Sequence, residues 1–354
     1  MGSGSHFLAA VKLTMLSKGN VNLTPLKNKM SVPRLTFACG LYDRMIPLYS
    51  GEVRPEGIDL QYVPIDFPRN IFDRMAAGQE FDAAEMSSSE FISRLSAGQC
   101  PFVAIPVFPS RMFRTSFITI NVKSGIGKPK DLEGKRVGVP LYTMTAAVWN
   151  RGHLQHEYGV DFSTVHWVQG SINNPGAHGE PSVLPLLKPV PIEINDSGKS
   201  LSQLLDERAI DAIIGTTLPA AMRHNPDIQR LFPDYRDLEK AYYKRTGIFP
   251  IMHLTVIRRE VYERHPFVAA SLYRALCESK KIALAKMRNL ASLRYMLPWL
   301  SSHLEELDEV FGDDPWPYGV EANRATLQAL VNYMVEQSLV AAPVPVDDIF
   351  VPVG

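Results

Sequence analysis

The 354-residue sequence has few cysteines, no net charge and no long apolar run. Its three cysteines, Cys39, Cys100 and Cys277, are far apart and lack CxxC spacing, so neither a disulfide framework nor a zinc ribbon is indicated, and a reducing compartment fits this usage. The 37 basic and 37 acidic side chains cancel, which leaves no overall field to hold nucleic acid or an anionic membrane. No run of about 18 apolar residues is present, as a transmembrane helix would need. A charged ligand must therefore be recognised locally.

The N-terminal residues show no export signal. The mildly apolar run at 7–16 is interrupted by Lys12, and no small-residue cleavage pattern follows it. We therefore expect a cytoplasmic protein. Residues 1–33 are rich in Gly, Ser, Asn and Lys and are predicted to form a flexible extension, with Met30 as an alternative start.

From residue 34 onward, strand-like and helix-like runs alternate, which predicts an α/β protein with parallel sheets covered by helices. We expect a first lobe from residues 34–115 and 252–354 and a second lobe from 116–251. The segment 170–199 is rich in Pro, Gly and Asn and is expected to be irregular. Everything after Pro266 is expected to be helical. The longest predicted helices are 145–158, 267–288, 290–300 and 321–337. Two such lobes predict a ligand cleft between them.

Two segments place hydroxyl groups where a strand ends and a helix begins. Ser87 and Glu90 have capping-box spacing, which is typical of an ordinary helix start. The N–H groups and hydroxyls of such a start also suit an anion, because the helix dipole favours negative charge there. Tyr142 and Thr145 stand at the second start. If the lobes face each other, the two starts converge on one cleft, where a small dianion would fit.

Arginines and one histidine strengthen this interpretation. Arg44, Arg111, Arg114 and Arg151 lie at strand ends, at the hinge or in first helical turns, and guanidinium groups suit carboxylates. Each alone is typical of a surface residue, and only the four together indicate a carboxylate site. His253 lies in an apolar run and fits either a core histidine or a catalytic one.

Signals for metals and cofactors are weak. His153 and His156, with Glu157 beside them, are compatible with a metal site or with a solvated helix face. The glycines at 125 and 127 lack the third glycine of a dinucleotide fingerprint, and the sequence has no P-loop, HExxH or G-x-S-x-G elbow. We therefore predict neither a metal nor an organic cofactor.

Longer segments resemble known families. Residues 131–140 (DLEGKRVGVP) resemble the turn and strand that often open the second lobe in the type 2 periplasmic-binding-protein superfamily. A further set, spread over about residues 34 to 340, is similar to the 4,5-dihydroxyphthalate decarboxylase family. These segments are 38–44 (ACGLYDR), 55–60 (PEGIDL), 81–87 (FDAAEMS), 101–111 (PFVAIPVFPSR), 144–149 (MTAAVW), 243–253 (YKRTGIFPIMH) and 316–319 (WPYG).

The resemblance implies a cytoplasmic enzyme of phthalate breakdown that makes protocatechuate and carbon dioxide without an organic cofactor, on a two-lobed α/β scaffold like that of type 2 periplasmic binding proteins. In 4,5-dihydroxyphthalate each carboxylate is para to a hydroxyl. A phenolate can therefore donate electrons to the carbon that bears the leaving carboxylate, and protonation of that carbon lets carbon dioxide depart. The chemistry needs a general base, a general acid and cations for the carboxylate that stays.

We assign candidate roles on this basis. His253 and Asp43 would transfer protons, with Glu85 as the alternative carboxyl group. Phe108 and Trp149 would flank the ring. The carboxylates would be held by Arg44, Arg111, Arg114, Arg151, Ser87, Ser88, Tyr142 and Thr145.

The partner expected is a small aromatic dicarboxylate, with neither nucleic acid nor membrane, and the sequence is compatible with a homo-oligomer. The alternative function is a solute-binding protein for an aromatic carboxylate, which would use the same scaffold. The lack of an export signal and the titratable His253 in the expected cleft both argue against that alternative.

Overall fold

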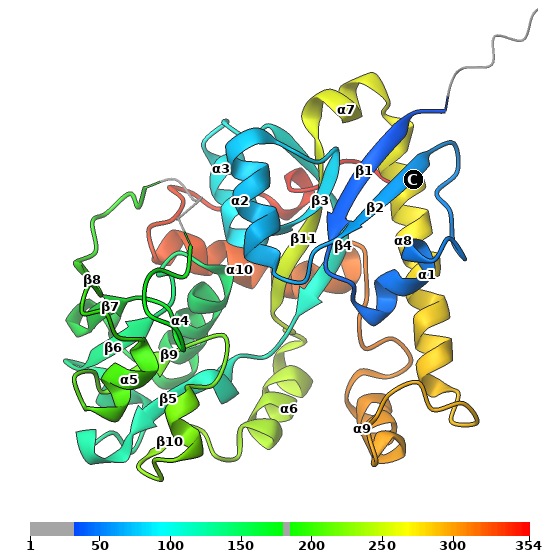
Figure 1. Cartoon of the computed structure of the whole chain (residues 1–354). Helices are drawn as coiled ribbons and strands as arrows, with labels where there is room; N and C mark the ends of the chain where they lie inside the picture. The colour runs from blue at the N-terminus through cyan, green and yellow to red at the C-terminus, as the bar shows by residue number, and fades with distance from the viewer. Residues whose placement is uncertain (1–31, 180–184) are drawn as a thin grey trace, which may run out of the picture. The chain divides into compact units, whose positions relative to one another are not determined.

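Two mixed β-sheets organise the computed structural model, which describes residues 32–179 and 185–354. Met30 and nearly all of the predicted extension at 1–33 lie outside these residues. The first sheet has the order β2-β1-β3-β11-β4 (Figure 1). Its strands are β1 (Arg34–Cys39), β2 (Asp59–Pro64), β3 (Ala83–Ser87), β4 (Phe102–Arg111) and β11 (Ile251–Arg258).

The alternating pattern predicted parallel sheets, but the first sheet is mixed. β1 pairs in parallel with β2 and β3, whereas β11 is antiparallel to both β3 and β4. Ile251 of β11 pairs with Arg111 of β4, so the chain re-enters the sheet beside the point where it left. A strand that returns in this way must run antiparallel to its neighbour. The sequence pattern marks β11 as a strand but carries no sign of its direction.

The second sheet has the order β10-β5-β9-β6-β7-β8. β6, β7, β8 and β9 pair in parallel, whereas β5 is antiparallel to β9 and β10. β8 lies inside the segment predicted to be irregular; it is a three-residue edge strand, defined by its pairing with β7. The strands are β5 (Ile118–Asn121), β6 (Arg136–Val139), β7 (His166–Gln169), β8 (Ile192–Ile194), β9 (Ala212–Ile214) and β10 (Ile228–Arg230). The predicted lobe boundaries at 115/116 and 251/252 stay a prediction.

Helices cover the sheets, with α2 and α3 on one side of the first sheet and α8 on the other (Figure 1). α4 and α8 have the bounds expected from the sequence. The helices are α1 (Ile46–Tyr49), α2 (Pro68–Gly78), α3 (Ser88–Ser96), α4 (Thr145–Tyr158), α5 (Leu201–Asp206), α6 (Tyr235–Thr246), α7 (Arg259–Arg264), α8 (Phe267–Arg288), α9 (Leu300–Phe311) and α10 (Arg324–Glu336). Among the described residues, no helix combines the length and the apolar character needed to cross a membrane.

The prediction of a helix at 290–300 is wrong. Residues 290–299 form turns and bends, and a helix begins only at Leu300. Pro298 disfavours helical backbone at the residue before it, and the large side chains of Met296 and Trp299 are exposed instead of packing on a common face. The C-terminal region is therefore less helical than expected.

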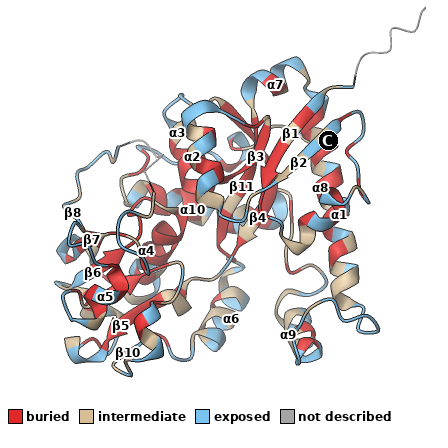
Figure 2. Ribbon diagram, viewed as in Figure 1, coloured by how far each residue is buried: buried red, intermediate tan, exposed pale blue. Residues whose placement is uncertain are grey.

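α4 belongs to the hydrophobic cores of both sheets. Val148 and Trp149 pack in the core of the first sheet, whereas Ala147 and Leu154 pack in that of the second. The strands around β3 and β11 are buried along almost their whole length (Figure 2). Contacts join residues 33–354 into one compact unit. The start of α4 is therefore held firmly beside the first sheet.

Candidate functional site

A cavity of about 270 Å³ lies where the starts of α3 and α4 meet. This volume is just below the roughly 300–1,000 Å³ range of small-molecule sites. Phe67, Phe72, Met144 and Met252 supply apolar walls. The polar and charged side chains that line it are Ser87, Glu90, Arg69, Arg114, Thr145, His178, Thr216 and His253.

The two helix starts converge here, as the sequence predicted. The hydroxyl of Ser87, at the start of α3, lies 3.0 Å from that of Thr145, the first residue of α4. The Ser89 N–H donates to Thr145 Oγ1 at 3.0 Å, and the Ser89 hydroxyl donates to the Thr143 carbonyl at 2.9 Å. Ser88 is buried beside this cluster and does not line the cavity.

A buried carboxylate orients His253. Nδ1 of His253 lies 2.6 Å from Oε1 of Glu85, whose side chain has no exposed surface. His253 sits at the third position of β11 and pairs across the ladder with Ser87 of β3, which brings its ring to the cavity wall. Phe72 packs edge-on against this ring, with the ring centroids 5.0 Å apart. With Nδ1 engaged by Glu85, Nε2 is the nitrogen left to meet a ligand.

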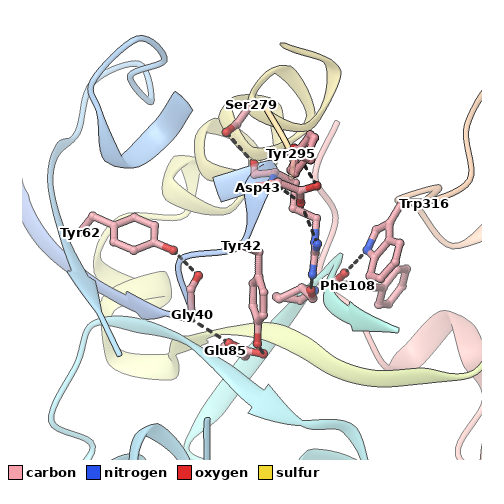
Figure 3. A network of polar contacts seen from close by, with 11 residues as sticks. Gly40, Tyr42, Asp43, Tyr62, Glu85, Phe108, Ser279, Tyr295 and Trp316 are labelled. Atoms are coloured by element: carbon pink, nitrogen blue, oxygen red, sulfur yellow. Dashed lines mark hydrogen bonds and ion pairs between the residues drawn. The ribbon is translucent and has the colours of Figure 1, made fainter. Parts of the chain in front are cut away.

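Further donors keep Glu85 ionised (Figure 3). The Tyr42 hydroxyl donates to Oε1 at 2.8 Å and the Gly40 N–H to Oε2 at 3.1 Å. Burial alone raises the pKa of Glu85, but the attraction of His253 and these hydrogen bonds outweigh it and lower the pKa below its usual value. Burial, followed by the Glu85 charge, raises the pKa of Tyr42, so this hydroxyl stays a donor. The Glu85–His253 pair resembles the carboxylate–imidazole half of a catalytic triad.

Arg114 brings a positive charge to the cavity without a carboxylate to balance it. Its guanidinium donates to the Thr216 carbonyl at 3.2 Å, and its buried Nε has no partner among the described residues. No ion pair with an acidic side chain is found for Arg114 within the described ranges. Burial lowers the pKa of Arg114 to about 10, so it remains charged at neutral pH. A half-buried cation of this kind suits an anionic ligand.

Arg69, Glu90 and His178 also line the cavity and were not among the predicted site residues. Arg69 and Glu90 form a 2.6 Å ion pair in the wall, and the other carboxylate oxygen of Glu90 is buried without a partner among the described residues. His178 enters from the connection between β7 and β8. The capping-box spacing drew attention to Glu90 only as part of a helix start, and no periodic pattern marks an irregular segment such as that of His178.

Asp43 and Arg44 lie in a different place. They line a separate cavity of about 190 Å³ with residues of α8 and α9. Arg44 is held between the rings of Tyr42 and Trp316, at 4.4 and 4.3 Å from their centroids, and its Nε donates to the Pro109 carbonyl at 3.0 Å. Asp43 pairs with Arg44 at 3.0 Å and does not contact His253. The carboxyl group beside His253 is therefore the alternative, Glu85.

Arg111 and Arg151 are structural cations. Arg111 donates to Asn323 Oδ1 at 2.7 Å and to the Phe249 carbonyl at 2.8 Å. Arg151 donates to the Tyr142 carbonyl at 2.8 Å and to Gln337 at 2.9 Å. Burial lowers the pKa of each to about 10, and neither lines the cavity. Carbonyl and amide partners use most of their donors, and one buried nitrogen of each has no partner among the described residues, so it is their position away from the cavity that separates them from Arg114.

The predicted aromatic walls are replaced by others. Phe108 is fully buried in the first core, and Trp149 donates its indole N–H to the Ile251 carbonyl at 2.9 Å. The Tyr142 ring is covered by the Arg151 guanidinium at 3.8 Å. None of these three lines the cavity, whereas the aromatic residues Phe67 and Phe72 do.

His153 and His156 have separate partners. His153 packs against the Tyr242 ring at 4.8 Å, and burial, aided by Arg245, lowers its pKa to about 4. His156 Nε2 lies 2.8 Å from Glu336. Within residues 32–179 and 185–354, no group of three or more His, Cys, Asp or Glu side chains is arranged to hold a metal ion.

Comparison with known proteins finds relatives along most of the chain. A 4,5-dihydroxyphthalate decarboxylase of Comamonas testosteroni is 37% identical over 295 residues, which cover 83% of this chain and 89% of that protein. One of Pseudomonas putida is 36% identical over 220 residues, covering 62% of this chain and 83% of that protein. No family model matches. Among solved structures, the periplasmic aliphatic sulphonate binding protein SsuA of Escherichia coli superposes with a TM-score of 0.52 at 14% identity, covering 90% of this chain and 92% of that one. The fold is therefore that of periplasmic binding proteins.

Proposed function

The chain belongs to the 4,5-dihydroxyphthalate decarboxylase family, and we propose that it is a carboxy-lyase that converts 4,5-dihydroxyphthalate, or a close hydroxylated aromatic diacid, to protocatechuate and carbon dioxide. One observation carries this proposal beyond the family relationship. His253 and the unbalanced cation of Arg114 line one cavity, and Glu85 lies directly behind His253. This combination provides both proton transfer and anion binding.

Arg114 holds the carboxylate that the product retains. A guanidinium can bind a carboxylate through two parallel hydrogen bonds, and this one has a buried donor to spare. Ser87 and Thr145 add hydroxyl groups at the two helix starts, where N–H groups and helix dipoles favour negative charge. The aromatic ring then lies against Phe67 and Phe72, the two aromatic rings of the cavity wall.

His253 delivers the proton that replaces carbon dioxide on the ring. The Glu85 carboxylate stabilises the imidazolium form of His253 and aligns it, as an orienting carboxylate does in a triad. Once the ring carbon is protonated, the bond to the leaving carboxylate breaks and its electron pair restores aromaticity. General acid catalysis of this kind contributes roughly 10²- to 10⁴-fold to the rate.

The cellular setting follows from the chemistry. We propose a role in aromatic catabolism, in the breakdown of phthalates, because the proposed product is protocatechuate. We propose a cytoplasmic location, which the three free cysteines Cys39, Cys100 and Cys277 support, because a reducing compartment fits this usage. A small aromatic dicarboxylate is the partner that the cavity requires, and assembly into a homo-oligomer is compatible with this role.

The test is direct. The purified protein is incubated with 4,5-dihydroxyphthalate, and released carbon dioxide and protocatechuate are measured. We expect stoichiometric formation of both. Saturable binding of the diacid without product would instead support the solute-binding alternative and overturn the proposal. His253→Ala should lower turnover by roughly 10²-fold or more. Near-normal turnover of this variant would remove His253 from the mechanism.

A further inference from the structure

The cavity contains a second imidazole. His178 lines it from the connection between β7 and β8 of the second sheet, whereas His253 lines it from β11 of the first. No other histidine in the described parts of the chain lines this cavity. Phenolate-assisted decarboxylation needs one group that accepts a phenolic proton and another that protonates carbon. A cavity with one imidazole from each sheet can supply both.

Close backbone packing fixes His178 at the cavity wall. The next residue, Gly179, lies directly on the Arg69 side chain of α2, because a Cβ built on it would stand only 2.8 Å from Arg69 Cδ. Arg69 is itself held by Glu90 at 2.6 Å and by Asp73 at 2.7 Å. The connection that carries His178 therefore rests on an anchored side chain that belongs to the first sheet's helices.

The two imidazoles have opposite electrostatic environments. Burial lowers the pKa of His178 and the Arg69 cation lowers it further, while Asp73 acts in the opposite direction. His178 is thus neutral at pH 7 and able to accept a proton. His253 instead has the buried Glu85 carboxylate 2.6 Å from its Nδ1. Such opposed environments are how enzymes divide acid and base roles between like groups.

We propose that His178 is a second catalytic residue, the base that removes the phenolic proton para to the leaving carboxylate, while His253 acts as the acid at the ring carbon. This inference deepens the proposed function and rests on it.

Protons and electrons balance in this scheme. His178 takes the hydroxyl proton, and the oxygen electron pair moves through the ring to the carbon that bears the leaving carboxylate. That carbon forms a bond to the proton of the His253 imidazolium. The carbon–carboxylate bond breaks, carbon dioxide leaves, and the bonding pair restores the aromatic ring. His178 returns its proton to the phenolate oxygen, and His253 regains one from solvent, so one proton is consumed in each turnover.

The experiment compares carbon dioxide release by the wild type, His178→Gln and His253→Ala from pH 5 to about pH 10 under anaerobic conditions. The wild-type kcat/KM should fall on the acid side only below the usual histidine pKa of about 6.5, because His178 must be unprotonated. Arg69 and Asp73 of α2 are the charged groups packed against His178, and Glu90 of α3 holds Arg69. His178→Gln should lose roughly 10²-fold in kcat at pH 7 with KM changed less than about threefold, and should lose this acid limb.

Alkaline pH distinguishes a base from a structural residue. As the substrate phenol ionises near its ordinary pKa of about 10, it no longer needs a base, so the His178→Gln activity should recover relative to wild type. His253→Ala should not recover. Gly179→Ala, which pushes the backbone away from Arg69, should lower kcat while keeping the acid limb.

The outcomes separate the two proposals. If the wild type releases no carbon dioxide, the proposed function fails and this inference falls with it. If the wild type is active but His178→Gln keeps turnover within about threefold, or keeps the acid limb and shows no alkaline recovery, the role of His178 is refuted while the proposed function stands.

Discussion

Replacing Glu85 by Gln removes the charge behind His253 while keeping the size of the side chain. In the wild type, Oε1 accepts from His253 at 2.6 Å and from Tyr42 at 2.8 Å, and Oε2 accepts from Gly40 at 3.1 Å. A glutamine has one oxygen in place of two, so its amide N–H₂ must face at least one of these donors. The variant loses both an acceptor and the stabilisation of the imidazolium.

Hydrogen bonds to a charged group contribute about 1.5–3 kcal/mol, so the loss at His253 should lower kcat roughly 10- to 150-fold. A similar loss should lower the free energy of unfolding. Because the pKa of Glu85 is lowered in the folded state, its stabilisation is present above the usual value of 4.5 and disappears as pH falls through the lowered pKa. The stability gap between wild type and Glu85→Gln should therefore narrow in acid.

The assay combines steady-state carbon dioxide release with urea unfolding at several pH values. Tyr42→Phe is the matched control, because it removes one donor to the same oxygen and leaves the charge, so its kcat should fall less than about tenfold. A folded Glu85→Gln protein with turnover within threefold of wild type would refute the role of this carboxylate.

Four further changes test other parts of the account. Arg114→Gln should raise KM roughly 10- to 100-fold in steady-state kinetics, and an unchanged KM would exclude Arg114 as the carboxylate anchor. Asp43→Asn should leave turnover within about twofold, since Asp43 lies outside the cavity; a large loss would reverse that placement. His153 has its pKa lowered to about 4, so its burial makes folding less favourable by up to about 3 kcal/mol as pH falls from 6.5 to 4. His153→Phe should flatten this part of the plot of unfolding free energy against pH. An unchanged slope of that plot would contradict the lowered pKa of His153. Gly152→Ala places a Cβ 2.1 Å from the Tyr333 ring and should lower stability by about 1–3 kcal/mol, whereas an unchanged melting temperature would show that α4 and α10 can separate at low cost.

The sequence predicts elements well where a local pattern defines them. α4 and α8 were expected at their observed bounds because apolar spacing and helix ends depend on residues that are close together in the sequence. The strand β8 was missed, because its segment has no strand pattern of its own and is a strand only by pairing with β7. The direction of β11 likewise depends on where the chain returns.

Site residues divide in the same way. Ser87 and Thr145 were found because a helix start has a local signature, and His253 because a titratable group in an apolar run is conspicuous. The sequence could not separate Arg114 from Arg111 and Arg151, because the difference lies in which of them the fold brings to the cavity wall. His178 has no local signal and reaches the cavity only through packing of its neighbour on Arg69.

A crystal structure with phthalate, which has the two carboxylates but no hydroxyl to react, tests the central claim most directly. The account predicts one carboxylate within hydrogen-bonding distance of the Arg114 guanidinium and the ring between Phe67 and Phe72, facing His253. Phthalate bound instead in the cavity of Asp43 and Arg44, with Arg114 uncontacted, would contradict it.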